Sequence, residues 1–402
     1  NRYDEIVQKL GLETAVQREM HQLSGGELQR LAIGATLLKD VDVYFMDEPS
    51  SYLDIYQRLK VSRVIAELAK KKHVMVIEHD LAVLDFLAEQ VHLVYGEEGA
   101  YGVFTQPKVV RHAINLYLDG FLKEENIRFR TQPIEFSAHP PRREEARVEL
   151  IRFDAVTKKQ GDFHLEVKAG RVDHGEVVGV LGPNATGKTT FVKILAGVDT
   201  SDAGAVHGSI KVAYKPQYIK PDFDGTVHEL LLQKAPILLN SPFHEGEITR
   251  PLNLRSIIEK NVDKLSGGEL QRVAIALCLA QQADLYLIDE PSAYLDSNQR
   301  MVAARTIRRI MEKEAKAGFV VDHDVYFIDM VADSLMVFGG QPGVHGTAEG
   351  PLDLRNGMNR FLKDLDVTFR RDPDTQRPRV NKPDSRLDRE QREVGEYYYA
   401  KA

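Results

Sequence analysis

Residues 182–189 have the types and spacing needed to bind a polyphosphate, because they match the phosphate-loop pattern G-x-x-x-x-G-K-[ST]. An apolar stretch at 177–181 precedes them, and helix-forming residues follow at 189–196. A loop between a buried strand and a helix start directs backbone N–H groups at phosphate oxygens. Lys188 would add a positive charge, and Thr189 would add a hydroxyl ligand for Mg²⁺. The predicted phosphate-binding residues are Gly182, Pro183, Asn184, Ala185, Thr186, Gly187, Lys188, Thr189 and Thr190.

Two acidic residues follow the apolar stretch at 285–288, which is predicted to be a buried strand. Asp289 would hold Mg²⁺ through water, and Glu290 would accept a proton from the attacking water or polarise it. An acidic strand end that only caps the next turn is the alternative. The loop at 182–189 makes the catalytic interpretation the stronger one.

Three further residues extend this chemistry. Gln217 lies 29 residues after Lys188 and suits a group that senses Mg²⁺ and the attacking water. His323 follows a strand predicted at 319–321 and would bond a γ-phosphate. Phe163 would either stack on adenine or pack in the core of its strand. The predicted catalytic residues are Lys188, Gln217, Glu290 and His323, and the predicted metal ligands are Thr189, Gln217 and Asp289.

The octapeptide Leu-Ser-Gly-Gly-Glu-Leu-Gln-Arg occurs twice, at 23–30 and at 265–272. This offset of 242 residues recurs downstream, while the repeated histidine is offset by 244. The matched pairs are Ser24 and Ser266, Asp47 and Asp289, Glu48 and Glu290, Asp54 and Asp296, and His79 and His323. Two copies with matched surroundings indicate a duplicated module. A position 242 residues before Lys188 falls before residue 1, so the first module is expected to be truncated at its N-terminus.

Each octapeptide is predicted to open a helix with an anion-binding turn that has no lysine of its own. The alternative is simple glycine-assisted helix capping, which does not explain eight identical residues. The predicted binding residues in these turns are Ser24, Gly25, Gly26 and Glu27 in the first copy and Ser266, Gly267 and Gly268 in the second.

The order of apolar strands and amphipathic helices predicts an α/β fold with a mainly parallel sheet. Strands are expected at 40–46 and 73–77, with a helix at 55–70 between them. The expected domains are the C-terminal part of a first nucleotide-binding domain (1–125), an inter-domain hinge (126–147), a complete second nucleotide-binding domain (148–351) and a C-terminal hinge or tail (352–402).

Composition narrows the class of protein. The 402 residues carry a formal net charge of −7, which gives no general attraction to nucleic acid. The sequence contains no run of 18 apolar residues and no signal-peptide pattern, so a cytoplasmic protein without membrane contact is expected. The single cysteine, Cys278, excludes a cysteine-ligated cluster within this sequence. Between Arg370 and Arg386 the local charge is +3, which could meet phosphates on RNA, remain solvated, or dock on the protein's own acidic residues.

Together these motifs resemble the ATP-binding-cassette (ABC) family, with a phosphate loop, a glutamine loop, LSGGE signatures, Asp-Glu boxes, D-loops ending at Asp54 and Asp296, and switch histidines. Asn-Ile-Arg-Phe-Arg at 126–130 and Phe-Arg-Arg-Asp-Pro at 369–373 resemble the ABC E subfamily of ribosome-recycling factors, the RNase L inhibitor family. One departure is Ala185, where relatives usually have glycine. The resemblance implies tandem ABC-type P-loop modules, each with a mixed, mainly parallel sheet and a helical signature subdomain.

The resemblance also implies how the modules work. The cassettes of the family pack head to tail, and each site holds ATP and Mg²⁺ between one phosphate loop and the other cassette's signature. One composite site would join 182–190, Gln217, Asp289, Glu290 and His323 to the first signature. The other would hold Asp47, Glu48, His79 and the second signature but lack its loop.

Family resemblance further implies partners: the small ribosomal subunit, through its rRNA and proteins, and termination factors. It implies iron–sulfur clusters only in an N-terminal domain that this sequence lacks. A fragment of this kind would therefore be defective in ribosome splitting. The alternatives are the ATPase subunit of a membrane transporter, an ABC F translation factor and a non-catalytic nucleotide-binding fragment.

Overall fold

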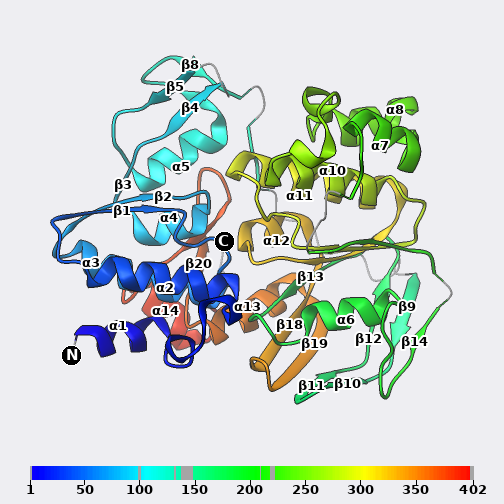
Figure 1. Ribbon diagram of the computed structural model, residues 1–402, viewed down its shortest axis with the longest axis horizontal. Coiled ribbons are helices and arrows are strands. Elements are labelled where there is room, and N and C mark those ends of the chain that lie inside the picture. Colours follow the sequence, from blue (N-terminus) through cyan, green and yellow to red (C-terminus); the bar gives the residue numbers. More distant parts are fainter. Residues whose placement is uncertain are drawn as a thin grey trace. The chain divides into compact units, whose positions relative to one another are not determined.

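The computed structural model describes residues 2–97, 101–130, 133–136, 148–208, 210–217 and 222–398. The chain divides into two compact units (Figure 1), one formed by 1–136 with 367–402 and the other by 137–366. The expected C-terminal region 352–402 is therefore divided between the two units. The expected hinge at 126–147 falls partly outside the described residues.

The first unit combines helices with short strands. Its helices are α1 (Arg2–Leu10), α2 (Gly25–Leu38), α3 (Ile55–Ala69), α4 (Leu81–Leu87), α5 (Val110–Asp119) and α14 (Arg386–Val394). Its strands are β1 (Val43–Asp47), β2 (His73–Ile77), β3 (Gln90–Val91), β4 (Val94–Glu97), β5 (Tyr101–Phe104), β6 (Lys108–Val109), β7 (Phe121–Leu122), β8 (Ile127–Arg128), β20 (Phe369–Arg371) and β21 (Pro378–Val380). Strands β1 and β2 pair in parallel, as predicted. The sequence pattern of β1 also predicted a buried strand, and this is wrong for one face, because alternate residues of β1 are exposed.

The second unit is built around a mixed sheet. Its strands are β9 (Glu149–Phe153), β10 (Val156–Gln160), β11 (Phe163–Val167), β12 (Gly170–Asp173), β13 (Val177–Leu181), β14 (Val206–His207), β15 (Val212–Lys215), β16 (Leu285–Asp289), β17 (Ala317–Val321), β18 (Ser334–Gln341) and β19 (His345–Asp353). Its helices are α6 (Lys188–Leu195), α7 (Val227–Lys234), α8 (Ile237–Asn240), α9 (Pro242–His244), α10 (Gly267–Leu279), α11 (Ser297–Glu314), α12 (Val325–Val331) and α13 (Leu354–Asp364).

The main sheet of this unit has the order β10-β11-β19-β18-β13-β17-β16-β15, and β12-β9-β14 form a smaller sheet. Strands β13, β15, β16 and β17 are parallel to their neighbours, so their carboxyl ends meet at one edge. This arrangement confirms the predicted α/β fold. It also places the residues after β13, β15, β16 and β17 at that edge, where ligands bind in open parallel sheets.

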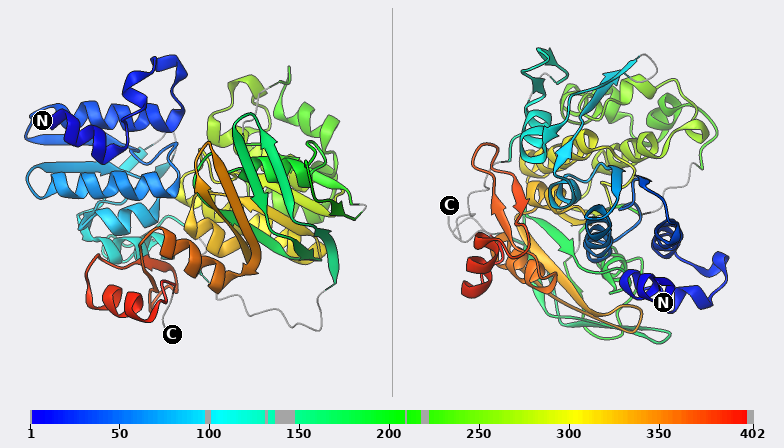
Figure 2. Two further views of the ribbon diagram at one scale, coloured as in Figure 1. Left: turned by 90° about the horizontal axis from the view of Figure 1, so that it is seen from below. Right: turned by 90° about the vertical axis from the view of Figure 1, so that its left-hand side faces the viewer.

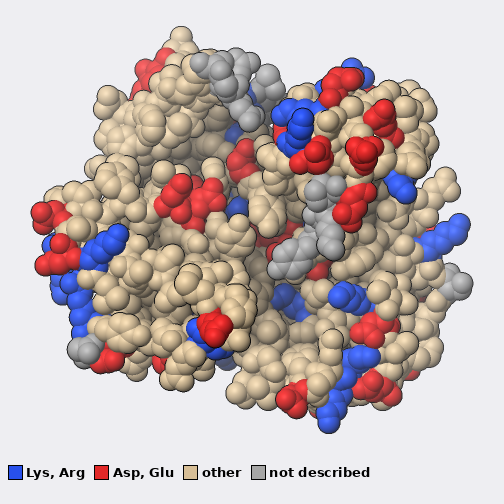
Figure 3. Space-filling model, viewed as in Figure 1, with Lys and Arg blue, Asp and Glu red and all other residues tan. Residues whose placement is uncertain are grey.

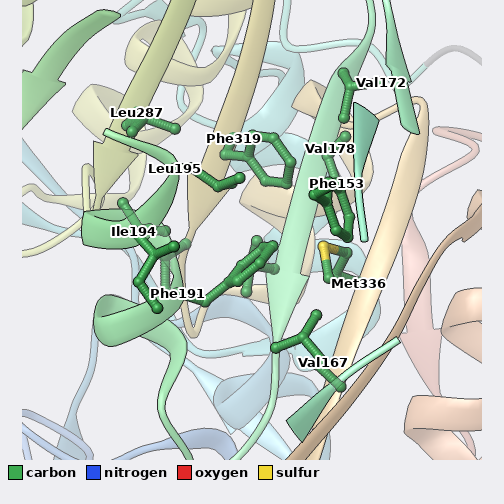
Figure 4. Close-up of a cluster of buried hydrophobic side chains, with 14 of the residues drawn as sticks. Phe153, Val167, Val172, Val178, Phe191, Ile194, Leu195, Leu287, Phe319 and Met336 are labelled. Atoms are coloured by element: carbon green, nitrogen blue, oxygen red, sulfur yellow. The ribbon is translucent and has the colours of Figure 1, made fainter. Parts of the chain in front are cut away.

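A continuous apolar core supports this edge (Figure 4). Phe191 and Leu195 of α6 pack with Val178 of β13, Phe319 of β17 and Phe153 of the smaller sheet. The Phe191 ring meets the Phe153 ring edge-on at a centroid distance of 5.3 Å. Full burial of each such side chain contributes about 1.5–3 kcal/mol. The core therefore holds α6, and with it the start of the phosphate loop's helix, against the sheet.

The equivalent strand pair of the first unit is covered differently. Phe45 of β1 is 71% exposed and Met75 of β2 is 53% exposed. Their counterparts in the repeat, Leu287 and Phe319, are completely buried in the core beneath α6. One face of β1 and β2 thus presents exposed apolar side chains, whereas the equivalent side chains of β16 and β17 are buried against α6 within the second unit.

The C-terminal segment of the first unit, red in Figure 2, lies against α4 and α5. Arg377 and Arg379 both pair with Asp85 of α4, and Arg111 of α5 pairs with Asp372. The basic segment predicted around 370–386 therefore docks on acidic residues of its own unit, which was one of the three expectations. Elsewhere, acidic and basic side chains are interspersed on the face shown in Figure 3.

Across the described residues, no helix has both the length and the apolar character required to cross a bilayer.

Candidate nucleotide-binding site

The phosphate loop of the second unit joins β13 to α6 as the sequence predicted. All five residues of β13 are buried, and α6 begins at Lys188. Gly182 and Gly187 have φ angles of +147° and +91°, which favour glycine. A Cβ atom at Gly187 would lie 2.8 Å from Leu165 Cδ1, and one at Gly182 would lie 2.4 Å from the carbonyl oxygen of Phe338. Both conformation and space therefore require these glycines.

Ala185 is the position where the family resemblance led us to expect glycine, and its φ angle of +59° lies in the left-handed region that favours glycine. An L-residue in the left-handed region costs about 1–2 kcal/mol. The Ala185 carbonyl accepts a hydrogen bond of 2.9 Å from the Gly343 N–H, which helps to hold this conformation. Alanine is small enough to leave the loop intact, but it carries strain that glycine would not.

Lys188 is folded into the loop and is only 7% exposed. Its Nζ donates to the carbonyl oxygens of Gly182 at 2.9 Å and Pro183 at 2.7 Å. Thr186 is completely buried and donates to the same Pro183 carbonyl at 2.7 Å. A buried ammonium beside a helix N-terminus is a concentrated positive charge, which suits the phosphates of a nucleotide.

Oxygen donors suited to Mg²⁺ lie at the start of α6 and at the end of β16. Thr189 Oγ1 donates to Asp289 Oδ2 at 3.0 Å. Burial raises the pKa of Asp289 to about 6, and the neighbouring charge of Glu290 adds to the rise. Among the described residues, no cluster of three or more His, Cys, Asp or Glu side chains could hold a metal. A hydroxyl, one carboxylate and the Gln217 amide instead fit Mg²⁺, which is usually bound by one or two carboxylates together with phosphates and waters.

Glu290 lies between Gln217 and His323. Gln217 Nε2 donates to Glu290 Oε1 at 2.7 Å, and His323 Nε2 lies 3.5 Å from the same oxygen. Burial would raise the pKa of Glu290, but interactions with His323 and Gln217 outweigh burial and lower it to about 2. The carboxylate is therefore ionised and oriented by two side chains.

The His323 side chain is 8% exposed, and apart from the Glu290 carboxylate at 3.5 Å from Nε2 its ring nitrogens have no hydrogen-bond partner within the described structure. A buried polar atom without a partner is costly unless a ligand or water satisfies it. His323 stands at the carboxyl edge beside Glu290, so a phosphate oxygen would satisfy it. A buried imidazole that makes no close hydrogen bond fits the γ-phosphate predicted for the site.

Phe163 lies on β11 beside the loop and is half-buried. Its ring lies close to the Gly187 and Gly346 backbones, where added Cβ atoms would meet it at 3.2 Å and 3.1 Å. Packing against the phosphate loop therefore explains why part of the Phe163 ring is buried, and adenine stacking stays a prediction.

The two signature turns are helix N-caps, one in each unit. The hydroxyls of Ser24 and Ser266 accept the backbone N–H groups of Glu27 and Glu269, each at 3.3 Å, in capping boxes. Gly25, Gly26, Gly267 and Gly268 follow these serines at the starts of α2 and α10. The expected anion-binding role is compatible with these caps, since further N–H groups lie at each helix start.

The signature glycines also permit a close approach that the sequence analysis did not anticipate. A Cβ atom at Gly26 would lie 3.0 Å from the Tyr52 carbonyl oxygen, and one at Gly268 would lie 2.8 Å from that of Tyr294. Both tyrosines have φ angles just above +60°. The signal was present in the sequence, because Tyr52 and Tyr294 are separated by the repeat offset of 242.

Asp54 and Asp296 cap the next helices. Asp54 accepts the Gln57 N–H at 2.9 Å to begin α3, and Asp296 accepts the Gln299 N–H at 2.8 Å to begin α11. Their predicted contribution to nucleotide binding stays a prediction beside this local role.

The first unit repeats the Glu–His geometry. His79 Nε2 lies 3.4 Å from Glu48 Oε1, which compares with 3.5 Å for His323 and Glu290. Asp47 ends β1 as Asp289 ends β16. Glu48 and His79 are more exposed than their counterparts, at 47% and 43% for the side chains. The two halves of the repeat therefore fold alike at these positions.

Two residues at the second-unit site were missed by the sequence analysis. Lys215 is 1% exposed, and its Nζ donates to the Asp289 carbonyl oxygen at 2.6 Å. Burial lowers the pKa of Lys215 to about 8. Asp322 accepts hydrogen bonds from the Ser292 hydroxyl at 2.6 Å and the His323 N–H at 2.7 Å. The one signal in the sequence was position, since Lys215 lies two residues before Gln217 and Asp322 lies directly before His323.

A phosphate loop after a buried parallel strand, with Gln217, Asp289, Glu290 and His323 at the same sheet edge, defines an ABC-type P-loop cassette. The sequence family described as ABC transporter matches residues 1–51 and 168–293. An "Uncharacterized ABC transporter ATP-binding protein" of Methanocaldococcus jannaschii is 52% identical over 99% of this chain and 66% of that protein. "ABC transporter E family member 1" of Arabidopsis thaliana is 44% identical over 98% of this chain and 67% of that protein.

A solved structure described as a complex of "archaeal ribosomal stalk protein aP1 and archaeal ribosome recycling factor aABCE1" matches with 53% identity and a TM-score of 0.95. The match covers 99% of this chain and 77% of that chain. The chain belongs to the ABC E family. It spans about two thirds of the length of the curated relatives that it matches.

Proposed function

We propose that the second unit binds ATP with Mg²⁺ and hydrolyses it. The observation that carries this proposal is the convergence at one sheet edge of Thr189 bonded to Asp289 and of Glu290 placed between Gln217 and His323. Thr189, Asp289 and Gln217 would hold Mg²⁺, which supplies charge neutralisation for the phosphate oxygens.

The residues of the chain then divide the work. Lys188 exchanges its bonds to loop carbonyls for bonds to phosphate oxygens. Glu290 accepts a hydrogen bond from the attacking water and thereby orients the water oxygen toward the γ-phosphorus. The water oxygen forms a bond to phosphorus while the bond from phosphorus to the bridging oxygen breaks. ADP leaves, and the two protons of the water stay on the released inorganic phosphate. His323 donates to the γ-phosphate as charge shifts onto the leaving oxygen.

We further propose that the site is composite. Ser24, Gly25, Gly26 and Glu27 would close on the nucleotide held by the second unit's loop. The signature at 266–268 would act with Asp47, Glu48 and His79 in a second site. Support for this pairing comes from membership of the ABC E family. Each unit by itself has a capped signature helix start and a glutamate–histidine pair at a matching distance, as two such sites require.

Replacing Glu290 tests hydrolysis. The Glu290→Gln variant is expected to lower steady-state phosphate release about 10²- to 10⁴-fold while retaining ATP through gel filtration, because general acid–base groups contribute factors of that size. The exposed Glu259 provides a control, since Glu259→Gln makes the same chemical change away from the edge. Unchanged turnover in Glu290→Gln would contradict the assigned role.

For the whole protein, we propose an ATP-driven role in ribosome recycling, with the ribosome and its stalk protein as partners in the cytoplasm. Support comes from family membership and from the name of the archaeal relative, which is 53% identical over nearly the full chain. Co-sedimentation of the full-length protein with ribosomal subunits tests this role. Association that depends on ATP is expected, and no association with or without ATP would refute it.

A further inference from the structure

Gln271 is a buried polar side chain that the proposed hydrolysis does not yet use. It is 1% exposed and lies on α10, within the same octapeptide as Ser266. Its Nε2 donates a hydrogen bond of 2.6 Å to the backbone carbonyl oxygen of Glu290. A buried amide that reaches another element by one short bond fixes the separation of the two elements.

The same bond occurs independently in the first unit. Gln29, at the equivalent octapeptide position on α2, donates to the Glu48 carbonyl oxygen at 3.1 Å. Simple helix formation does not require glutamine at this position, since many residues form helices as well. The repeated bond therefore gives the seventh residue of the octapeptide a specific target, the glutamate after the β-strand.

That target has a strained backbone. Glu48 and Glu290 have φ angles of +43° and +47°, a region that residues other than glycine rarely adopt. Such conformations persist only where surrounding bonds hold them, and they cluster at functional sites. For Glu290, the N–H donates to the Val321 carbonyl at 2.7 Å and the carbonyl accepts from Gln271 at 2.6 Å. Lys215 holds the preceding carbonyl, that of Asp289, at 2.6 Å.

The direction of the Glu290 carboxylate depends on this backbone, because a change of φ swings the side chain about the chain axis. The bond from Gln217 to Glu290 Oε1 at 2.7 Å and the His323 distance of 3.5 Å both require the observed direction. Loss of the Gln271 donor would leave the Glu290 carbonyl only its two longer hydrogen bonds, from the Ala293 N–H at 3.4 Å and from Lys215 Nζ at 3.5 Å.

We propose that Gln271 is a positioning residue for ATP hydrolysis, which holds the Glu290 backbone in its strained conformation and ties it to the signature helix α10. This inference rests on the proposed function of the second unit. Gln271 touches neither nucleotide nor metal in this account, so it acts only through Glu290.

The test is the Gln271→Met variant, which keeps side-chain length and removes the donor. Its kcat is expected to fall about 10- to 100-fold, as for small displacements of catalytic groups, while the KM for ATP stays within twofold. Gln282→Met makes the same change at an exposed site and should leave kcat unchanged. Gln271→Glu, which is nearly isosteric and also lacks the donor, provides a second variant should the first fail to fold.

A double variant separates positioning from a general loss of structure. In the Glu290→Gln background, Gln271→Met should cause no further loss of residual turnover, because its effect passes through the replaced carboxylate. An equal loss in both backgrounds, or wild-type kcat in both Gln271 variants, would overturn the proposal. If Glu290→Gln itself hydrolyses ATP like the wild type, the proposed function fails and this inference fails with it. If Glu290→Gln loses ATP hydrolysis while Gln271→Met hydrolyses ATP at the wild-type rate, only this inference is rejected and the proposed function stands.

Discussion

Asp85 of α4 offers the sharpest test of what holds the C-terminal segment to the first unit. It accepts hydrogen bonds from Arg379 Nε at 3.0 Å and Nη2 at 2.9 Å, and from Arg377 Nη1 at 3.3 Å. The side chains of Asp85 and Arg377 are completely buried, and that of Arg379 is 11% exposed. The Asp85→Asn substitution keeps the shape of the side chain but leaves two buried guanidinium groups without their shared counter-charge.

The expected cost follows from this burial. Removing one partner of a buried ion pair typically destabilises a protein by about 3–5 kcal/mol. Asp372 lies 3.6 Å from Arg379 Nη1 and compensates part of the charge, so we expect about 3 kcal/mol, at the lower end of that range. Asp374 provides the matched control, because it is 67% exposed and pairs with the partly exposed Arg111. Asp374→Asn should cost about 0–1 kcal/mol.

Amide hydrogen exchange of peptides that cover β20 and β21 measures this cost locally. A local readout is needed because a chain of two units need not unfold in one transition, and the sequence contains no tryptophan to report it. Exchange in the hairpin should accelerate about 100-fold in Asp85→Asn, which corresponds to about 3 kcal/mol, and little in Asp374→Asn. Equal exchange rates in the two variants would refute the reasoning.

Three further substitutions test the loop and the C-terminal helix. Ala185→Gly should raise the unfolding free energy of the second unit by about 0.5–1 kcal/mol in urea titrations, because it removes the left-handed strain; a decrease would contradict this. Gly187→Ala should weaken ATP binding at least about tenfold by calorimetry, since its Cβ would lie 2.8 Å from Leu165; an unchanged Kd would count against the loop geometry. Burial alone would raise the pKa of Asp388, but the Thr368 hydrogen bond and other partners lower it below its ordinary value. The stabilisation by Asp388 is therefore present above the unfolded pKa of about 3.9 and is lost as pH falls through the lower folded pKa. In an acid titration followed by circular dichroism, Asp388→Asn should lose less stability over this pH range than the wild type.

The local elements were predictable because their signals are local. The stretch 177–181 is uniformly apolar and is followed by a glycine loop, and it forms β13 with those bounds. The repeated serine and glutamate of the octapeptide form a capping box, which is readable over four residues. The gathering of Asp289 and His323 at one edge follows from parallel strands that are buried on both faces.

Longer-range features were not predictable in the same way. The positive segment around Arg377 and Arg379 has no local sign of its partner, since Asp85 lies 292 positions before Arg377. For the same reason, the sequence did not predict that the region 352–402 is divided between the two units near Asp366. The burial of Lys215 depends on carbonyl acceptors that another strand supplies, and composition alone favours an exposed lysine.

A crystal structure of the Glu290→Gln variant with ATP and Mg²⁺ tests the central claim most directly. The triphosphate should lie in the loop at 182–189, with Mg²⁺ at Thr189 and Asp289 and the γ-phosphate beside His323. Lys188 should then have left its bonds of 2.9 Å and 2.7 Å to the loop carbonyls for phosphate oxygens. Nucleotide bound elsewhere, or a loop in which Lys188 keeps those bonds at saturating ATP, would contradict the account.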